Sequence, residues 1–189
     1  MNGVCYTPVP MSNPRATLTI AIRPAEEYQL AFLEEQFSPQ SLSENHHRRY
    51  AVQARSDGMY LIAWSDDTPI GHLLLIWEAP DEDVARGYPP RTAYLQSGGT
   101  REAYRRKGVM TRLIDEAERL AAEEGYRSIG LAVGSTDNPV ARRLYERLGY
   151  RDWGKGEVTL TWEYARRDGR TGTESEVCIY MFKDLRNRR

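Results

Sequence analysis

The stretch from Thr92 to Val133 constrains the fold more than any other part of the chain. Residues 92–100 favour a strand, residues 109–124 carry apolar side chains at helical spacing, and residues 128–133 favour a second strand. A strand, a helix and a strand of these lengths favour two parallel strands joined by a right-handed crossover. The sequence therefore predicts an α/β fold with a parallel pair of strands in it.

A short basic turn, Arg105-Arg106-Lys107-Gly108, separates the first of these strands from the helix. The N-terminus of a helix has several unpaired N–H groups and roughly half a positive charge, so it attracts anions. Three cationic side chains add full charges here. We expect the turn to bind a pyrophosphate, and the alternative for the turn taken alone is a solvated basic turn at a helix start.

Further strands and helices are expected on both sides of this unit. The expected strands are 17–22, 59–64, 70–77, 158–164 and 177–182, and the expected helices are 24–37, a segment that begins near 41–43 and ends near 54, and 139–148. The second and third of these strands, and likewise the last two, are expected to form hairpins. The long loop 78–91 is expected to be functional.

The composition is that of one soluble domain. The chain has 189 residues, 40% of them hydrophobic and 28% charged, and we expect residues 1–16 to form a flexible extension and residues 17–189 a single domain. A net charge of −1 argues against a nucleic-acid binder. No apolar run approaches the roughly 18 residues of a membrane span, so a cytoplasmic protein is expected. Neither the two cysteines nor the adjacent His46 and His47 have metal-site spacing, and no metal is expected.

Two segments resemble the motifs of one enzyme family. The run Thr100–Leu113 resembles the acetyl-CoA motif of the GCN5-related N-acetyltransferases (GNAT), in which Arg105 and Gly108 match and Met110 stands where Gly or Ala is usual. The run Asn138–Tyr150 resembles the second motif of that family at nearly every position. The resemblance covers residues 17–150 and implies the GNAT fold: a mixed, twisted sheet of about seven strands, flanked by about four helices and splayed around the cofactor.

The resemblance implies that acetyl-CoA is the acyl donor. Its pyrophosphate is expected at the turn and first helical residues, and its pantetheine arm beside the strand before the turn, where two glycines allow close approach and can mark a bulge. Asn138 is expected to bind the arm, a role compatible with capping its helix, and Arg142 and Arg143 to reach the outer phosphate. The expected cofactor-binding residues are thus Gly98, Gly99, Thr100, Arg105, Arg106, Lys107, Gly108, Val109, Met110, Thr111 and Asn138.

Tyr145 is the expected general acid, because the family uses its motif tyrosine to protonate the departing thiolate; the alternative is a core tyrosine. The general base stays open. Ala132 stands where ribosomal-protein acetyltransferases of this superfamily carry a glutamate. The remaining candidates are Gln96 through a water, His72, and the loop acids Glu78, Asp81, Glu82 and Asp83.

The expected reaction is direct transfer of an acetyl group to a primary amine, without a covalent enzyme intermediate, because neither cysteine lies near a motif. Acidic residues in loop 78–91 and around the first helices favour a cationic small molecule as the acceptor. The alternatives are a protein or peptide N-acetyltransferase and a non-catalytic acyl-CoA-binding sensor. The resemblance is also compatible with a homodimer.

Overall fold

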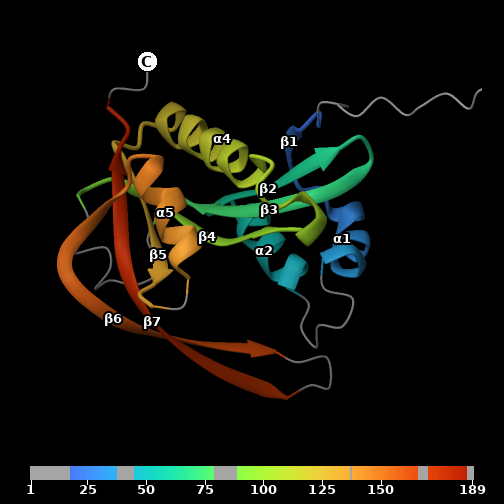
Figure 1. Cartoon of the computed structure of the whole chain (residues 1–189). Coiled ribbons are helices and arrows are strands. Elements are labelled where there is room, and N and C mark those ends of the chain that lie inside the picture. The colour runs from blue at the N-terminus through green and yellow to red at the C-terminus, as the bar shows by residue number, and fades with distance from the viewer. Residues whose placement is uncertain (1–17, 38–44, 79–88, 137, 166–169, 187–189) are drawn as a thin grey trace, which may run out of the picture.

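A computed structural model describes residues 18–37, 45–78, 89–136, 138–165 and 170–186 (Figure 1). The expected extension 1–16 lies outside these residues. Within them the chain forms one seven-stranded sheet in the order β1-β2-β3-β4-β5-β7-β6, in which only β4 and β5 are parallel. The strands are β1 (Ala21–Pro24), β2 (Gly58–Ser65), β3 (Thr68–Ile76), β4 (Thr92–Thr100), β5 (Ser128–Gly134), β6 (Arg151–Ala165) and β7 (Thr171–Asp184).

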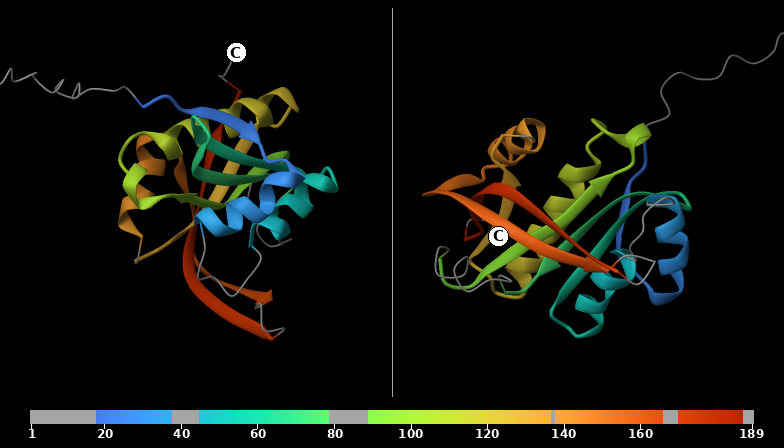
Figure 2. Two further views of the ribbon diagram at one scale, coloured as in Figure 1. Left: turned by 90° about the vertical axis from the view of Figure 1, so that its right-hand side faces the viewer. Right: turned by 90° about the horizontal axis from the view of Figure 1, so that it is seen from below.

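Four α-helices among the described residues cover the two faces of the sheet, as the resemblance predicts (Figure 2). The helices are α1 (Leu30–Phe37), α2 (Asn45–Ala54), α4 (Val109–Glu123) and α5 (Pro139–Arg147), with short 3-10 turns at Glu27–Gln29 and Glu102–Tyr104. Helices α4 and α5 pack on one face, and α1 and α2 pack on the other. None of the described helices is long and apolar enough to cross a membrane.

The periodicity of α4 explains where the larger core lies. Leu113, Ile114 and Ala117 share one side of the helix and have no exposed surface. They contact alternate residues of the central strands, among them Leu95 and Leu131. The side chains between those residues point to the opposite face, because successive side chains of a strand alternate. This alternation places Tyr94 and Ala132 on the α1–α2 side.

Strands β4 and β5 pair over only part of their length. Their register runs from Thr92 opposite Ser128 to Leu95 opposite Leu131 and then ends. Beyond that point β4 continues beside β3, and β5 continues beside β7. The sheet therefore splits into two halves from residues 96 and 132 onward, as the predicted splay requires.

A bulge occurs on β4 where the split begins. Leu74 lies opposite Gln96 and His72 lies opposite Gly99, so Ser97 and Gly98 together face one residue of β3. Ser97 has a φ of 52°, in the left-handed region. Bulges bend a strand and increase its twist, which turns β4 away from β5. The expectation that the glycines mark a bulge is confirmed.

The C-terminal hairpin is the largest departure from the predicted elements. Strands β6 and β7 have 15 and 14 residues, whereas the sequence predicts only 158–164 and 177–182 as strands. The outer part of the hairpin is mostly exposed, so no buried face imposes an apolar alternation there. Gly154 and Gly156, at an irregularity in the β6 register, interrupt the pattern further.

The N-terminal elements also shift. The strand expected at 17–22 forms at Ala21–Pro24, and Leu18 and Ile20 pack against the core without joining the sheet. The helix expected from Pro24 begins as a 3-10 turn at Glu27 and becomes α-helical at Leu30. Pro24 instead ends β1, because its register with Leu61 is the last pair between β1 and β2.

A buried ion pair joins α4 to β7. The Lys183 ammonium donates to both carboxylate oxygens of Glu118, at 2.7 and 3.0 Å, and lies 5.7 Å from the centre of the Tyr150 ring. Glu118 has no exposed surface. Removal of one partner of a buried pair leaves the other charge in a medium that solvates it poorly.

We expect Lys183→Met to lower the free energy of unfolding by about 3 kcal/mol, because it removes the ammonium that pairs with both oxygens of the buried Glu118 carboxylate. Urea unfolding followed by circular dichroism measures this change. Arg119→Ala is the matched control, since Arg119 pairs with Glu116 and Glu123 on the exposed side of the same helix and its loss leaves the midpoint nearly unchanged. Equal effects of the two variants would contradict a structural role for the buried pair.

Candidate functional site

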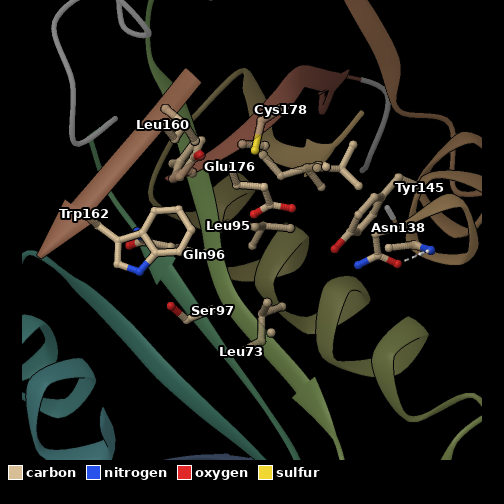
Figure 3. A pocket seen from close by; sticks show the side chains of 17 residues that line it. Leu73, Leu95, Gln96, Ser97, Asn138, Tyr145, Leu160, Trp162, Glu176 and Cys178 are labelled. Atoms are coloured by element: carbon tan, nitrogen blue, oxygen red, sulfur yellow. Dashed lines mark hydrogen bonds between the residues drawn. The ribbon is translucent and has the colours of Figure 1, made fainter. Parts of the chain in front are cut away.

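A cavity of about 390 Å³ opens where β4 and β5 separate (Figure 3). One side is formed by residues 95–98 of β4 and 131–134 of β5, and another by Asn138, Ala141 and Tyr145 of α5. The hairpin completes the wall with Leu160, Trp162, Glu176 and Cys178. The cavity thus joins the split in the sheet to the inner surface of the hairpin.

The basic turn lies between β4 and α4 and has the backbone of an open helix start. Gly108 caps α4 with a φ of 81°, which favours glycine, and no side chain caps this end. The first intrahelical bond runs from the Arg112 N–H to the Gly108 carbonyl, at 3.1 Å, so the N–H groups of residues 109–111 precede it. A Cβ atom on Gly108 would have no neighbour within 4 Å. The turn therefore offers several N–H donors beside open space.

The three cationic residues of the turn take different positions. The Arg105 Nε donates to the Thr100 carbonyl over 3.4 Å and ties the turn to the end of β4. The Lys107 ammonium lies over the Tyr104 ring, 5.4 Å from its centre. The backbone of Arg106 is in the left-handed region, with a φ of 60°. Arg106 and Lys107 are exposed, so their charges remain accessible to an anion.

The Met110 side chain packs against β4, beside Gly98. A Cβ atom placed on Gly98 would lie 3.2 Å from the Met110 Cε and 3.1 Å from a Leu73 methyl carbon. The Met110 side chain therefore lies over the β4 bulge, in space that the missing Cβ of Gly98 provides. This position explains how the larger residue fits where the family motif has Gly or Ala.

Helix α5 brings two motif residues to the cavity. The Asn138 side chain accepts a hydrogen bond from the Ala141 N–H at 3.2 Å and caps the helix. The Tyr145 hydroxyl points into the cavity, while its ring packs edge-on against Tyr150 with 5.9 Å between centres (Figure 3). Burial raises the pKa of Tyr145 above its ordinary value near 10, so the phenol keeps its proton at neutral pH.

The arginines of α5 do not line the cavity. Arg142 pairs with Glu146 at 3.1 Å and with Asp152 at 3.8 Å. Arg143 is exposed. The structure therefore does not bring these two residues to the wall around Tyr145.

The candidate bases fall in different places. Gln96 and Ala132 line the cavity, whereas Glu78 and His72 do not. Asp81, Glu82 and Asp83 lie outside the described residues. Among the described residues no group of three or more His, Cys, Asp or Glu side chains is arranged to hold a metal ion.

His72 belongs instead to a buried aromatic cluster between the sheet and the first two helices. Its ring lies 5.2 Å from that of His46 and 4.9 Å from that of Phe37, and His46 shares a hydrogen bond of 2.7 Å with the Tyr60 hydroxyl. Burial, followed by the charge of Arg49, lowers the pKa of His46 to about 3 and that of His72 well below 6.5. Both rings are therefore neutral at physiological pH.

The wall residues that the hairpin contributes were not identified from the sequence. Glu176 and Trp162 reach the cavity from β7 and β6, and Glu176 is the only charged side chain among the described residues that line it. Glu176 and Trp162 project from the same face of the hairpin, because the strand register places Glu176 opposite Leu160, and Trp162 is two residues from Leu160. Cys178 also lines the cavity, although it is far from both motifs in sequence.

The buried histidines predict an acid-sensitive fold. Between pH 6.5 and the lower folded pKa values the unfolded chain binds more protons, so stability falls as the pH falls. From pH 7 to pH 5 we expect each histidine to contribute a loss on the order of 2 kcal/mol. Urea unfolding of wild type and His72→Asn at both pH values measures this loss. The difference between pH values should shrink in the variant, and an unchanged difference would contradict burial of His72 as a neutral ring.

A family model and a curated protein that match this sequence both belong to the same enzyme family. Residues 24–150 match the sequence model of the acetyltransferase (GNAT) family. A stretch of 59 residues is 44% identical to GCN5-related N-acetyltransferase 4, chloroplastic, of Arabidopsis thaliana, and covers 31% of this chain and 20% of the length of that protein.

Solved structures share the fold at low identity. The structure of Arabidopsis thaliana NAA60 in complex with acetyl-CoA is 20% identical with a TM-score of 0.62, over 88% of this chain and 98% of that one. The ribosomal-protein-alanine N-acetyltransferase from Brucella melitensis is 18% identical with a TM-score of 0.62, over 87% of this chain and 99% of that one.

Proposed function

The chain belongs to the acetyltransferase (GNAT) family and is therefore an acyltransferase, and we propose that it transfers the acetyl group of acetyl-CoA directly to a primary amine of a small molecule. The observation that carries this proposal is the cavity at the split between β4 and β5, which has Tyr145 in its wall and lies beside β4, whose end leads into the basic turn. An elongated donor with an anionic centre and a reactive end requires such an arrangement.

The anionic part of the donor would lie at the turn. The N–H groups of residues 109–111, with the charges of Arg106 and Lys107, suit a pyrophosphate, and each charge-assisted hydrogen bond contributes about 1.5–3 kcal/mol. Arg105 would hold the turn in place through its hydrogen bond to the Thr100 carbonyl at the end of β4. Gly108 leaves the approach open.

The pantetheine arm would pass along the split. Beyond Leu95 the backbone of β4 no longer pairs with β5, so its polar groups on that edge are available to a ligand that runs beside it. The bulge at Ser97 and Gly98 turns this edge toward the gap, and Asn138 borders it from α5. The acetyl end would then reach the cavity near Tyr145.

Tyr145 would act as the general acid. As the amine nitrogen bonds to the thioester carbonyl carbon, the carbon–sulfur bond breaks and the sulfur takes the proton of the Tyr145 hydroxyl. The phenolate then recovers a proton from the nitrogen, which becomes the amide. Burial raises the pKa of Tyr145, so at neutral pH the phenol carries the proton that this step requires.

The size of the cavity favours a small acceptor. About 390 Å³ must take both the acetyl end of the donor and the amine. The hairpin also extends toward α2, where Arg48 donates to the Glu163 carbonyl over 3.2 Å, and so bounds the acceptor side. A peptide acceptor and a sensor without turnover are the alternatives, and a panel of amines and peptides with acetyl-CoA separates them by the rate of CoA release.

We expect Gly108→Asp to abolish measurable acetyl-CoA binding, because it places a negative charge and a strained residue at the turn that would hold the pyrophosphate. Calorimetric titration with acetyl-CoA measures the affinity. Asp115→Asn, on the same helix and away from its first turn, is the control and should bind as wild type does. Unchanged affinity in Gly108→Asp would contradict the placement of the pyrophosphate.

We expect Tyr145→Phe to lower kcat at pH 7 by about a hundredfold, because loss of a general acid costs at least that much, while acetyl-CoA affinity stays the same. Steady-state CoA release measures the rate. Cys178→Ala serves as the control for direct transfer, since this thiol also lines the cavity and its removal should preserve turnover. A wild-type rate in Tyr145→Phe would exclude this residue as the acid.

A further inference from the structure

Among the described residues, the hairpin side of the cavity carries a single carboxylate, that of Glu176. This side chain projects from β7 into the cavity, toward the region that Tyr145 faces from α5 (Figure 3). It is half-buried, and no lysine, arginine or histidine of the described part of the chain lines the cavity. Among the described wall residues, the negative charge of Glu176 therefore has no cationic neighbour.

The surroundings of Glu176 are largely apolar. Leu160 lies directly opposite Glu176 in the hairpin register. Cys178, two residues further along β7, lies on the same face and also lines the cavity. Leu95 and Tyr94 of β4 form the adjoining wall. A carboxylate that loses part of its hydration in such a setting binds a cation more strongly than an exposed one does.

Trp162 lies two residues from Leu160 and so shares its face of β6. Its indole lines the cavity while 41% of the residue surface stays exposed, which is a large apolar area at the mouth. In Figure 3 the Glu176 carboxylate lies between the Trp162 indole and the Tyr145 phenol. The faces of indole rings attract cations and pack against alkyl or aromatic groups.

Resting on the proposed acetyl transfer, we propose that Glu176 and Trp162 form the acceptor site, which binds an alkylammonium or arylalkylammonium ion. The carboxylate holds the charged nitrogen near the acetyl group, and the indole packs against the apolar body of the amine. An amine that enters this site with its charge paired is presented between the acid on α5 and the carboxylate on β7.

Glu176 also provides a destination for the ammonium proton. One N–H bond of the ammonium breaks and its proton moves to a carboxylate oxygen, which leaves a neutral amine with a free electron pair and a neutral carboxylic acid. The neutral nitrogen is the form that attacks the thioester.

The test measures acceptor binding separately from turnover. The full chain, saturated with CoA, is titrated calorimetrically with 2-phenylethylamine, with hexylamine and with 2-phenylethanol, a neutral compound of nearly the same shape as the first amine. Glu176→Gln should weaken binding of the amines by about tenfold or more and leave the alcohol unchanged, because only the charge contact is lost. Trp162→Leu should weaken both aromatic compounds.

Glu174→Gln is the matched control. Glu174 lies opposite Trp162 in the hairpin register but does not line the cavity, so its variant should bind all three compounds as wild type does. Salt gives a second readout: amine affinity of the wild type should fall as ionic strength rises, and that dependence should be reduced in Glu176→Gln.

Each failure has a distinct signature. If wild type releases CoA from acetyl-CoA with these amines and Glu176→Gln matches it in binding and rate, the acceptor site is wrong and acetyl transfer stands. If the amines bind through Glu176 but no CoA is released, acetyl transfer is wrong and the site stands. Absence of amine binding to wild type, or tighter binding of a short peptide with a free N-terminus, would overturn the proposed acceptor class.

Discussion

The end of pairing between β4 and β5, after Leu95 and Leu131, is the constraint on which the site depends. Two neighbouring strands that separate would lose hydrogen bonds on their facing edges, which is costly unless each strand is held elsewhere. Here β4 stays paired with β3, and β5 with β7, while α4 packs across the central strands with Leu113, Ile114 and Ala117. The gap therefore lies between strands that stay paired on their other edges, and the cavity occupies it.

Small backbone irregularities fit the gap to a ligand. The bulge at Ser97 and Gly98 turns β4 away from β5, and the absence of a side chain at Gly98 makes room for Met110. Met110 is thereby kept off the open side of the turn, where Gly108 and the uncapped start of α4 leave N–H donors accessible. Gly98 of β4 thus accommodates the methionine at position 110, where the family motif has Gly or Ala.

The strong periodicity of α4 and the buried central strands allowed the parallel unit to be predicted from the sequence. The two adjacent glycines of β4 indicated the bulge, and the resemblance to the GNAT family implied the splay of the sheet. The same resemblance assigned Asn138 and Tyr145 to one site, and both line the cavity. Sequence reasoning failed for the hairpin, whose outer residues have no core face to set a pattern. Glu176 and Trp162 reach the cavity only through the cross-strand register of two long strands, which local sequence does not specify. For the same reason Cys178 was not expected in the wall. His72 of β3 was not recognised as a buried residue, because its packing against His46 and Phe37 depends on how α1 and α2 lie on the sheet.

We propose that the split between β4 and β5 holds the arm of the acyl donor, with its reactive end between Tyr145 and the hairpin. A crystal structure of the full chain with bound CoA tests this most directly. We predict that the pyrophosphate lies at the N–H groups of residues 109–111, the arm beside β4 beyond Leu95, and the sulfur near the Tyr145 hydroxyl. CoA bound elsewhere on the domain, or β4 and β5 paired beyond Leu95 and Leu131 with the arm outside the sheet, would contradict it.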